Sequence, residues 1–186
     1  MTTRWRPEFD PQHLTFLTTT AAQHTHIFQR DIVKRILLDT LYHTCQMNKV
    51  HLYAYVLVPN HVHVIIQCPP DCSLANWTRA FKTSAAQLIV RQYQVENNQQ
   101  ALEALAALVT RAKKQTYKVW EDGYLAKSVA TPAFLEQKLT YIHNNPVQPH
   151  WHLADNPEGY RWSSARYYHA EEPCLIPVRD ARELLG

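Results

Sequence analysis

The first third of the chain alternates between strand-like and helix-like patterns of hydrophobic and polar residues. Residues 13–20 are rich in β-forming residues and predict a strand. From 31 to 45 the apolar residues recur at helical spacing. Residues 50–58 and 61–67 predict two further strands, with a Pro-Asn turn signal at 59–60. These two strands are therefore expected to form an antiparallel hairpin.

The rest of the chain predicts helices on either side of one more strand. Ser73 and Thr131 each precede an apolar helical run, and their side chains suit the N-cap position. Pro132 at the first helical position strengthens the second start, and Pro146 ends that helix. The elements expected after the hairpin are a helix over 73–95, a helix over 99–114, a strand within 116–129, a helix over 131–144 and an irregular tail from 147.

The order β-α-β-β-α-(α)-β-α is a split β-α-β pattern typical of a ferredoxin-like sheet. We therefore expect an α+β fold with an antiparallel sheet and helices on one face. Composition agrees, because 186 residues with 46% hydrophobic and 19% charged residues suit one globular domain. Only three Gly occur, which excludes a Gly-rich phosphate loop. The net charge of +3 is compatible with a nucleic-acid partner.

The apolar runs of the chain are too short for a membrane span. The stretch from Met1 to Pro7 lacks the apolar core of a signal peptide. We therefore expect a cytoplasmic protein with no membrane partner, whose four cysteines are reduced thiols.

The segment with the most informative chemistry is Pro59-Asn60-His61-Val62-His63. Because successive side chains of a strand point to opposite faces, His61 and His63 project together. Two imidazoles on one strand supply half of a divalent-metal site. The alternative is that Val62 packs in the core while both imidazoles merely face solvent.

A second candidate lies at the end of the helix expected over 131–144. At about 100° per residue, Tyr141 falls well away from the centre of the apolar side of this helix. Asn145 follows four residues later and shares the side of Tyr141. A phenol and an amide therefore occupy a face that the core does not need. The alternative is a half-buried Tyr and an Asn that only ends the helix.

Together these segments resemble the HUH transposases with a single catalytic tyrosine, and within them the REP-associated tyrosine transposases. The stretches that carry the resemblance are 54–63, which ends in His-Val-His, 120–124 (Trp-Glu-Asp-Gly-Tyr), 141–146 (Tyr-Ile-His-Asn-Asn-Pro) and 160–165 (Tyr-Arg-Trp-Ser-Ser-Ala). The resemblance implies one such domain over about 13–168, after a lead-in at 1–12 and before a tail at 169–186. The stretch 94–116 is longer than usual in the family, which implies a helical insertion.

The resemblance also implies roles for individual residues. Tyr141 corresponds to the nucleophile, which would form a 5′-phosphotyrosine with DNA and release a 3′-OH. His61, His63 and Asn145 correspond to the ligands of a metal ion, Mg²⁺ or Mn²⁺. Because Pro146 disfavours helical backbone in the residue before it, we expect Asn145 to leave the helix and turn toward the strand.

The activity implied by the resemblance is metal-dependent nicking and joining of single-stranded, hairpin-bearing DNA, in transposition or the mobilisation of REP-type repeats. The active unit would be a monomer or a homodimer. Basic residues on the expected helices are candidate phosphate contacts, although Lys and Arg are more often solvated surface. These candidates are Arg79, Lys82, Lys113 and Lys114.

Three other functions remain open at this point. A DNA hairpin-binding module without catalysis would have no need of all four candidate site residues. An RNA-binding ferredoxin-like domain would carry aromatic residues on its paired central strands. A metal-dependent hydrolase that uses water would cut DNA without forming a protein adduct.

Overall fold

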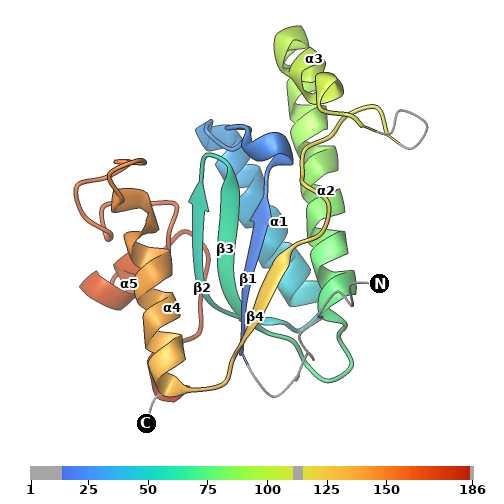
Figure 1. Cartoon of the computed structure of the whole chain (residues 1–186). Coiled ribbons are helices and arrows are strands. Elements are labelled where there is room, and N and C mark those ends of the chain that lie inside the picture. Colours follow the sequence, from blue (N-terminus) through green and yellow to red (C-terminus); the bar gives the residue numbers. More distant parts are fainter. Residues whose placement is uncertain (1–13, 111–114, 185–186) are drawn as a thin grey trace, which may run out of the picture.

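The computed structural model describes residues 14–110 and 115–184, so the expected lead-in at 1–12 lies outside the described residues. Its centre is an antiparallel sheet with the strand order β2-β3-β1-β4 (Figure 1). This is the expected ferredoxin-like arrangement, and it confirms the α+β class. The strands are β1 (Leu14–Thr20), β2 (His51–Val58), β3 (His61–Gln67) and β4 (Leu125–Val129).

Strand β3 is central because it pairs with β2 on one side and β1 on the other. The expected hairpin is present, and its two-residue turn at 59–60 brings Val58 opposite His61. On the other side, Thr18 of β1 lies opposite His63. Both histidines are thus held by strands on each side, while the intervening Val62 is buried on the opposite face.

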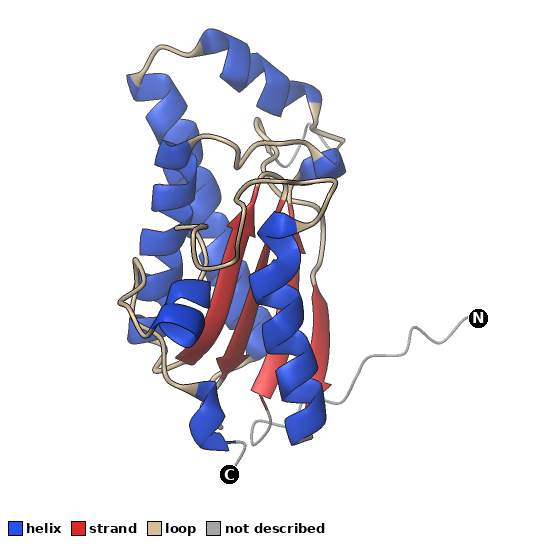
Figure 2. Cartoon of the chain, turned by 90° about the vertical axis from the view of Figure 1, so that its left-hand side faces the viewer, coloured by secondary structure: helices blue, strands red, loops and turns tan. Residues whose placement is uncertain are grey.

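The helices flank the sheet on two sides, as Figures 1 and 2 show. Helices α1 (Asp31–Met47) and α2 (Leu74–Val95) lie on one side, which agrees with the expected arrangement. Helix α4 (Pro132–Asn144) lies on the other side of the sheet. The helices therefore cover both faces, where the sequence predicted helices on one face. The reason is that β1 and β3 also carry apolar side chains on this second face, including the buried Phe16 and Ile65.

The expected N-caps are confirmed by their hydrogen bonds. The Ser73 side chain accepts from the backbone N–H of Asn76, and the Thr131 side chain accepts from that of Phe134. Helix α3 (Gln99–Ala107) packs against α2 and ends earlier than the expected 114, where residues 111–114 lie outside the described part. No helix in the described ranges is long and apolar enough to cross a membrane, and all four cysteines are free.

The segment after α4 is more regular than expected and covers the outer edge of β2. It contains the helix α5 (Ala165–Ala170) and the 3₁₀ turns η2 (Asn145–Val147) and η3 (Ala181–Leu184). The Leu57 N–H donates to the Trp162 carbonyl at 2.9 Å, and the Ser164 N–H donates to the Tyr55 carbonyl at 2.9 Å. Pairing of this kind satisfies backbone groups that an open sheet edge would leave exposed.

The stretch 120–124 holds the start of β4 against the rest of the fold. The Trp120 ring packs 4.7 Å from the Phe28 ring, and its Nε1–H donates to the Lys82 carbonyl at 3.0 Å. Gly123 has a φ of +76°, a conformation that favours glycine at this turn. The Trp-Glu-Asp-Gly-Tyr motif therefore has a structural role in this chain.

Candidate active site

The two imidazoles of β3 converge on the face of the sheet that α4 covers. The centres of the His61 and His63 rings are 4.4 Å apart. His63 is 4% exposed, and His61 is partly exposed. The prediction that they share one face is therefore confirmed, and neither simply faces solvent.

The hydrogen bonds that Asn60 makes determine which nitrogen of His61 carries the proton and which carries the lone pair. The Asn60 amide nitrogen donates to the His24 carbonyl at 3.2 Å, which turns the amide oxygen toward His61. That oxygen lies 2.6 Å from His61 Nδ1 and can only accept, so Nδ1 carries the proton. The lone pair of His61 is consequently on Nε2, a buried atom with no hydrogen-bond partner.

His63 is oriented in a similar way from the neighbouring strand. Its Nδ1 lies 2.7 Å from the Thr18 hydroxyl, and its Nε2 is buried without a partner. When Nδ1–H donates to that hydroxyl, the lone pair of His63 is also on Nε2. A hydrogen bond to the remote ring nitrogen is the usual way in which proteins orient a metal-binding histidine.

Both imidazoles are held in the neutral form by their surroundings. Burial lowers the pKa of His61 to about 4, and His150 and His24 lower it too, whereas the Asn145 amide beside the ring raises it. Burial lowers the pKa of His63 well below its ordinary range, and His61 and Lys138 add to this effect. Neutral imidazole is the form that binds metal ions.

Helix α4 places Tyr141 and Asn145 next to the two histidines. The Tyr141 ring lies 5.2 Å from the His63 ring, and the Asn145 amide lies beside His61. The spacing of Tyr141 and Asn145 along the helix matches that of His61 and His63 along the strand. Four helical residues and two strand residues each advance the chain by roughly 6 Å. Tyr141 is 47% exposed, which confirms that its side chain is not part of the hydrophobic core.

The backbone of Asn145 differs from the expectation. Its φ of −56° and ψ of −47° are helical, and it begins the 3₁₀ turn η2 instead of leaving the helix. This helical backbone keeps the Asn145 side chain on the same side as Tyr141, four residues earlier. Asn145 is 5% exposed, and its Oδ1 is buried without a hydrogen-bond partner.

Three buried acceptors without a hydrogen-bond partner among the described residues therefore belong to the three residues expected to bind a metal: His61 Nε2, His63 Nε2 and Asn145 Oδ1. Burying such atoms without partners is costly, so a bound cation would relieve the cost. Two imidazole nitrogens and one amide oxygen suit Mn²⁺ or Mg²⁺ with coordination positions left for oxygen ligands. A cluster of three His, Cys, Asp or Glu is not found among the described residues, since the third donor here is an amide.

Two residues beside the site were not singled out by the sequence pattern. Lys138 Nζ lies 4.8 Å from the centre of the Phe16 ring and 5.4 Å from that of Tyr141. The sequence could have indicated Lys138, because it lies three residues before Tyr141 and such residues are neighbours on a helix. The Trp151 ring lies 6.0 Å from the His61 ring. These residues are 90 positions apart in the sequence, so no local pattern indicates the contact.

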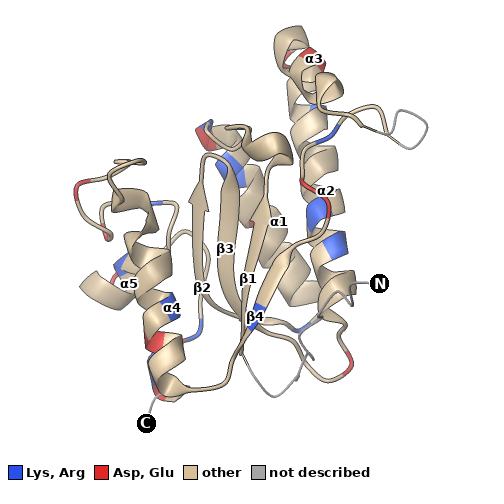
Figure 3. Ribbon diagram, viewed as in Figure 1, with Lys and Arg blue, Asp and Glu red and all other residues tan. Residues whose placement is uncertain are grey.

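Of the basic residues expected to contact phosphate, the two that the structure describes, Arg79 and Lys82, lie on α2 and not at this site. Lys82 Nζ donates to the Glu121 carbonyl at 2.7 Å and to the Gly123 carbonyl at 2.6 Å, which uses two of its three donors, and its role as a phosphate contact stays a prediction. Arg79 is exposed on α2 and donates to Asn76. Lys113 and Lys114 lie outside the described residues. Figure 3 shows basic residues distributed over α1, α2, α4 and the segment that follows α4.

Comparison with known proteins gives consistent results. A family model described as IS200-like transposase matches residues 12–145. A solved structure of a REP-associated tyrosine transposase bound to a REP hairpin is similar over 96% of this chain and 94% of that chain, with a TM-score of 0.66 and 14% identity. A putative transposase from Deinococcus radiodurans R1 has a TM-score of 0.47 and 18% identity, over 77% of this chain and 97% of that one. No curated protein matches the sequence.

Proposed function

The chain belongs to the IS200-like transposase family, and on this premise we propose that it nicks and rejoins single-stranded DNA through a covalent bond to Tyr141. The observation that carries the proposal is the position of a half-exposed phenol beside three buried acceptors without partners, on His61, His63 and Asn145. Strand β3 is buried on both sides, and α4 packs through Leu135, Leu139 and Ile142, so the arrangement is held before any substrate binds.

The substrate that we infer is single-stranded DNA with hairpin-forming repeats. The similar structure of a REP-associated tyrosine transposase was solved with a REP hairpin, which supports this class of partner. A single strand is required near the cut because its backbone must reach a phenol that stands over the face of a sheet. Trp151 beside His61 offers a ring on which an unpaired base can stack.

Tyr141 carries out the bond exchange in this proposal. Its Oη attacks the scissile phosphorus, the bond from phosphorus to the 3′ oxygen breaks, and that oxygen leaves as a 3′-OH after gaining a proton. The product is a 5′-phosphotyrosine diester, which conserves the energy of the broken bond. Attack by a second 3′-OH on this diester releases Tyr141 and joins the strands without ATP.

His61, His63 and Asn145 would hold the divalent ion through the three free acceptors. A bound Mg²⁺ or Mn²⁺ supplies Lewis-acid polarisation of the phosphoryl oxygens. The hydrogen bonds that the two imidazoles donate to Asn60 Oδ1 and to the Thr18 hydroxyl keep both rings turned toward one point. Lys138 adds positive charge next to the phenol, where the phosphate must sit during attack.

The direct test is to incubate the protein with single-stranded hairpin oligonucleotides and Mn²⁺ and to look for a protein–DNA adduct on a denaturing gel. We expect an adduct and a free 3′-OH product, and we expect EDTA to prevent both. Cutting without an adduct would favour a hydrolase that uses water. Hairpin binding without cutting would favour a binding module, and either result would refute the proposal.

Replacing Thr18 with Val is expected to weaken metal-dependent nicking by about 10–100-fold, the range seen when a partner of a metal-binding histidine is lost. Val has nearly the same shape, but it removes the hydroxyl that lies 2.7 Å from His63 Nδ1. The Mn²⁺ concentration needed for half-maximal rate should rise. Thr18→Ser keeps the hydroxyl and should retain activity; equal loss in both variants would contradict this positioning role.

A further inference from the structure

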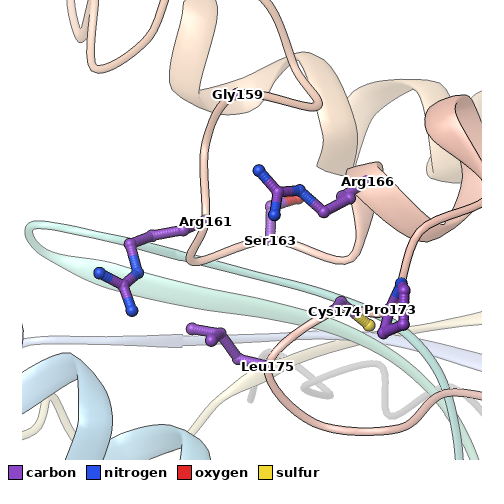
Figure 4. Close-up of a pocket in the computed structure, with 7 residues that line it drawn as sticks. All are labelled: Gly159, Arg161, Ser163, Arg166, Pro173, Cys174 and Leu175. Carbon is purple, nitrogen blue, oxygen red and sulfur yellow. The ribbon is translucent and has the colours of Figure 1, made fainter.

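The segment after α4 forms a pocket of about 390 Å³ at the outer edge of β2, beyond residues 12–145 that match the family model. Figure 4 shows its lining, with Arg161, Ser163 and Arg166 on one part of the chain and residues 173–175 on another. Two arginines and a hydroxyl line this pocket, and none of its lining residues is acidic. A pocket with this lining favours an anion.

Most of the donors on both arginines remain available. No carboxylate in the described ranges pairs with Arg161, whose guanidinium lies 5.1 Å from the centre of the Trp162 ring. Arg166 uses its Nε toward Glu172 at 3.5 Å, which leaves the two terminal nitrogens of the guanidinium. Ser163 Oγ accepts from the Ala165 N–H at 3.1 Å, so its O–H can still donate. Planar guanidinium groups suit a phosphate because they offer paired donors.

Further positive charge lies beside Trp162, the residue between Arg161 and Ser163. Lys34 and Arg35 of α1 lie 5.6 Å and 5.7 Å from the centre of the same Trp162 ring. Their acidic neighbours are exposed, with Asp31 at 3.4 Å from Lys34 and Asp39 at 3.8 Å from Arg35. The pair of Arg35 and Asp39 is partly exposed and therefore weak, so Arg35 can add to the attraction for an anion. The Lys34 side chain is 8% exposed and its Nζ donates to the Gln29 carbonyl at 2.6 Å, so Lys34 contributes less.

The pocket lies within reach of a strand bound at Tyr141. Ser163 is bridged to Val56, and Val56 is opposite His63, so the backbones of Ser163 and His63 are two strand spacings apart, roughly 10 Å. That separation corresponds to on the order of three nucleotides of a stacked strand, at about 3.4 Å each. Helix α4 packs on β2, and its His143 Nε2 lies 3.0 Å from Ser164 Oγ. A strand that joins Tyr141 to the pocket therefore passes over α4 and needs more nucleotides than this direct separation.

We propose that Arg161, Arg166 and Ser163 form a phosphate site that holds the DNA backbone several nucleotides from the cut. The inference rests on the proposed function, because it assigns part of the same DNA path. It makes the C-terminal segment a part of substrate binding. The pocket residues at 159–175 are thus distinct from the proposed active-site residues, which lie on β3, on α4 and in the turn η2.

The test is to measure binding of a fluorescent hairpin oligonucleotide with a single-stranded flank, at several salt concentrations. Arg161→Ala and Arg166→Ala together should weaken binding at least about tenfold. The slope of log affinity against log salt should become shallower by about 0.7 for each lost phosphate contact. The DNA concentration needed for half-maximal nicking should rise with the loss of affinity. Arg91→Ala on α2 removes one exposed charge elsewhere and should have little effect.

Unchanged affinity and slope in the double variant, or equal loss in Arg91→Ala, would overturn the inference. Arg161→Lys with Arg166→Lys keeps the charge and the packing, and an intermediate loss there is expected from the missing paired donors. If inorganic phosphate changes Trp fluorescence only in the parent protein while DNA affinity is equal in both, the pocket binds a free anion instead of DNA. If the parent protein binds the DNA but never nicks it, and the double variant loses binding, the proposed function is wrong but the phosphate site is supported.

Discussion

Tyr141→Phe is expected to abolish nicking and adduct formation, with a loss of at least about 10⁴-fold, because the only nucleophile of the proposed mechanism is removed. Hairpin binding should stay within about twofold of the parent protein. The substitution removes one oxygen and retains the ring, whose contacts with Phe16 at 5.9 Å and His63 at 5.2 Å are between rings. The adduct gel measures the first effect, and fluorescence anisotropy with labelled hairpin DNA measures the second.

A matched control for this variant is Tyr42→Phe. Tyr42 is 38% exposed on α1, across the sheet from α4, and its loss of a hydroxyl should leave nicking unchanged. Cleavage that survives in Tyr141→Phe would remove Tyr141 from the mechanism. The family assignment and the fold would remain.

The second large effect is expected for His61→Ala, which should lower nicking by about 10²–10³-fold through weakened charge stabilisation at the phosphate. The change removes one of three acceptors that face the proposed ion, while His63 and Asn145 remain. His61 is the less buried of the two imidazoles, so its removal disturbs packing less. Added Mn²⁺ should restore part of the rate, because the two remaining ligands still bind the ion weakly.

His43→Ala serves as the control, since this exposed histidine lies on α1. Full activity of His61→Ala in the presence of EDTA would exclude the metal from the mechanism. The same variant also tests which chain supplies the tyrosine. Tyr141 and His63 contact one another within one chain, so a mixture of Tyr141→Phe and His61→Ala proteins should not nick. Restored nicking would mean that Tyr141 acts on the histidines of a second copy.

The resemblance that the motifs indicate is confirmed by the family model, which covers most of the chain. The domain boundaries and the cytoplasmic location stay predictions. The roles of Tyr141, His61, His63 and Asn145 likewise remain proposals, although the structure brings these residues together as expected. The expected functional roles of Arg79, Lys82, Lys113 and Lys114 gain no support from the described residues.

The sequence alone determined the four strands, the main helices and the directions of their side chains, because these depend on periodicities of two and 3.6 residues and on local capping. It missed the short helix α5 after residue 147 and the end of α3. That reasoning placed His61 and His63 on one face of a strand and kept Tyr141 off the apolar side of its helix. The caps at Ser73 and Thr131 follow from the same local chemistry.

Only the tertiary structure decided how these elements meet. Contacts between residues distant in sequence decide which face of the sheet α4 covers. They also decide that His63 is hydrogen-bonded to Thr18 and that Lys82 donates to backbone carbonyls. Pairing of residues 162–164 with β2 is of the same kind. Such contacts are selected by packing and hydrogen-bond satisfaction over the whole chain, so no local pattern encodes them.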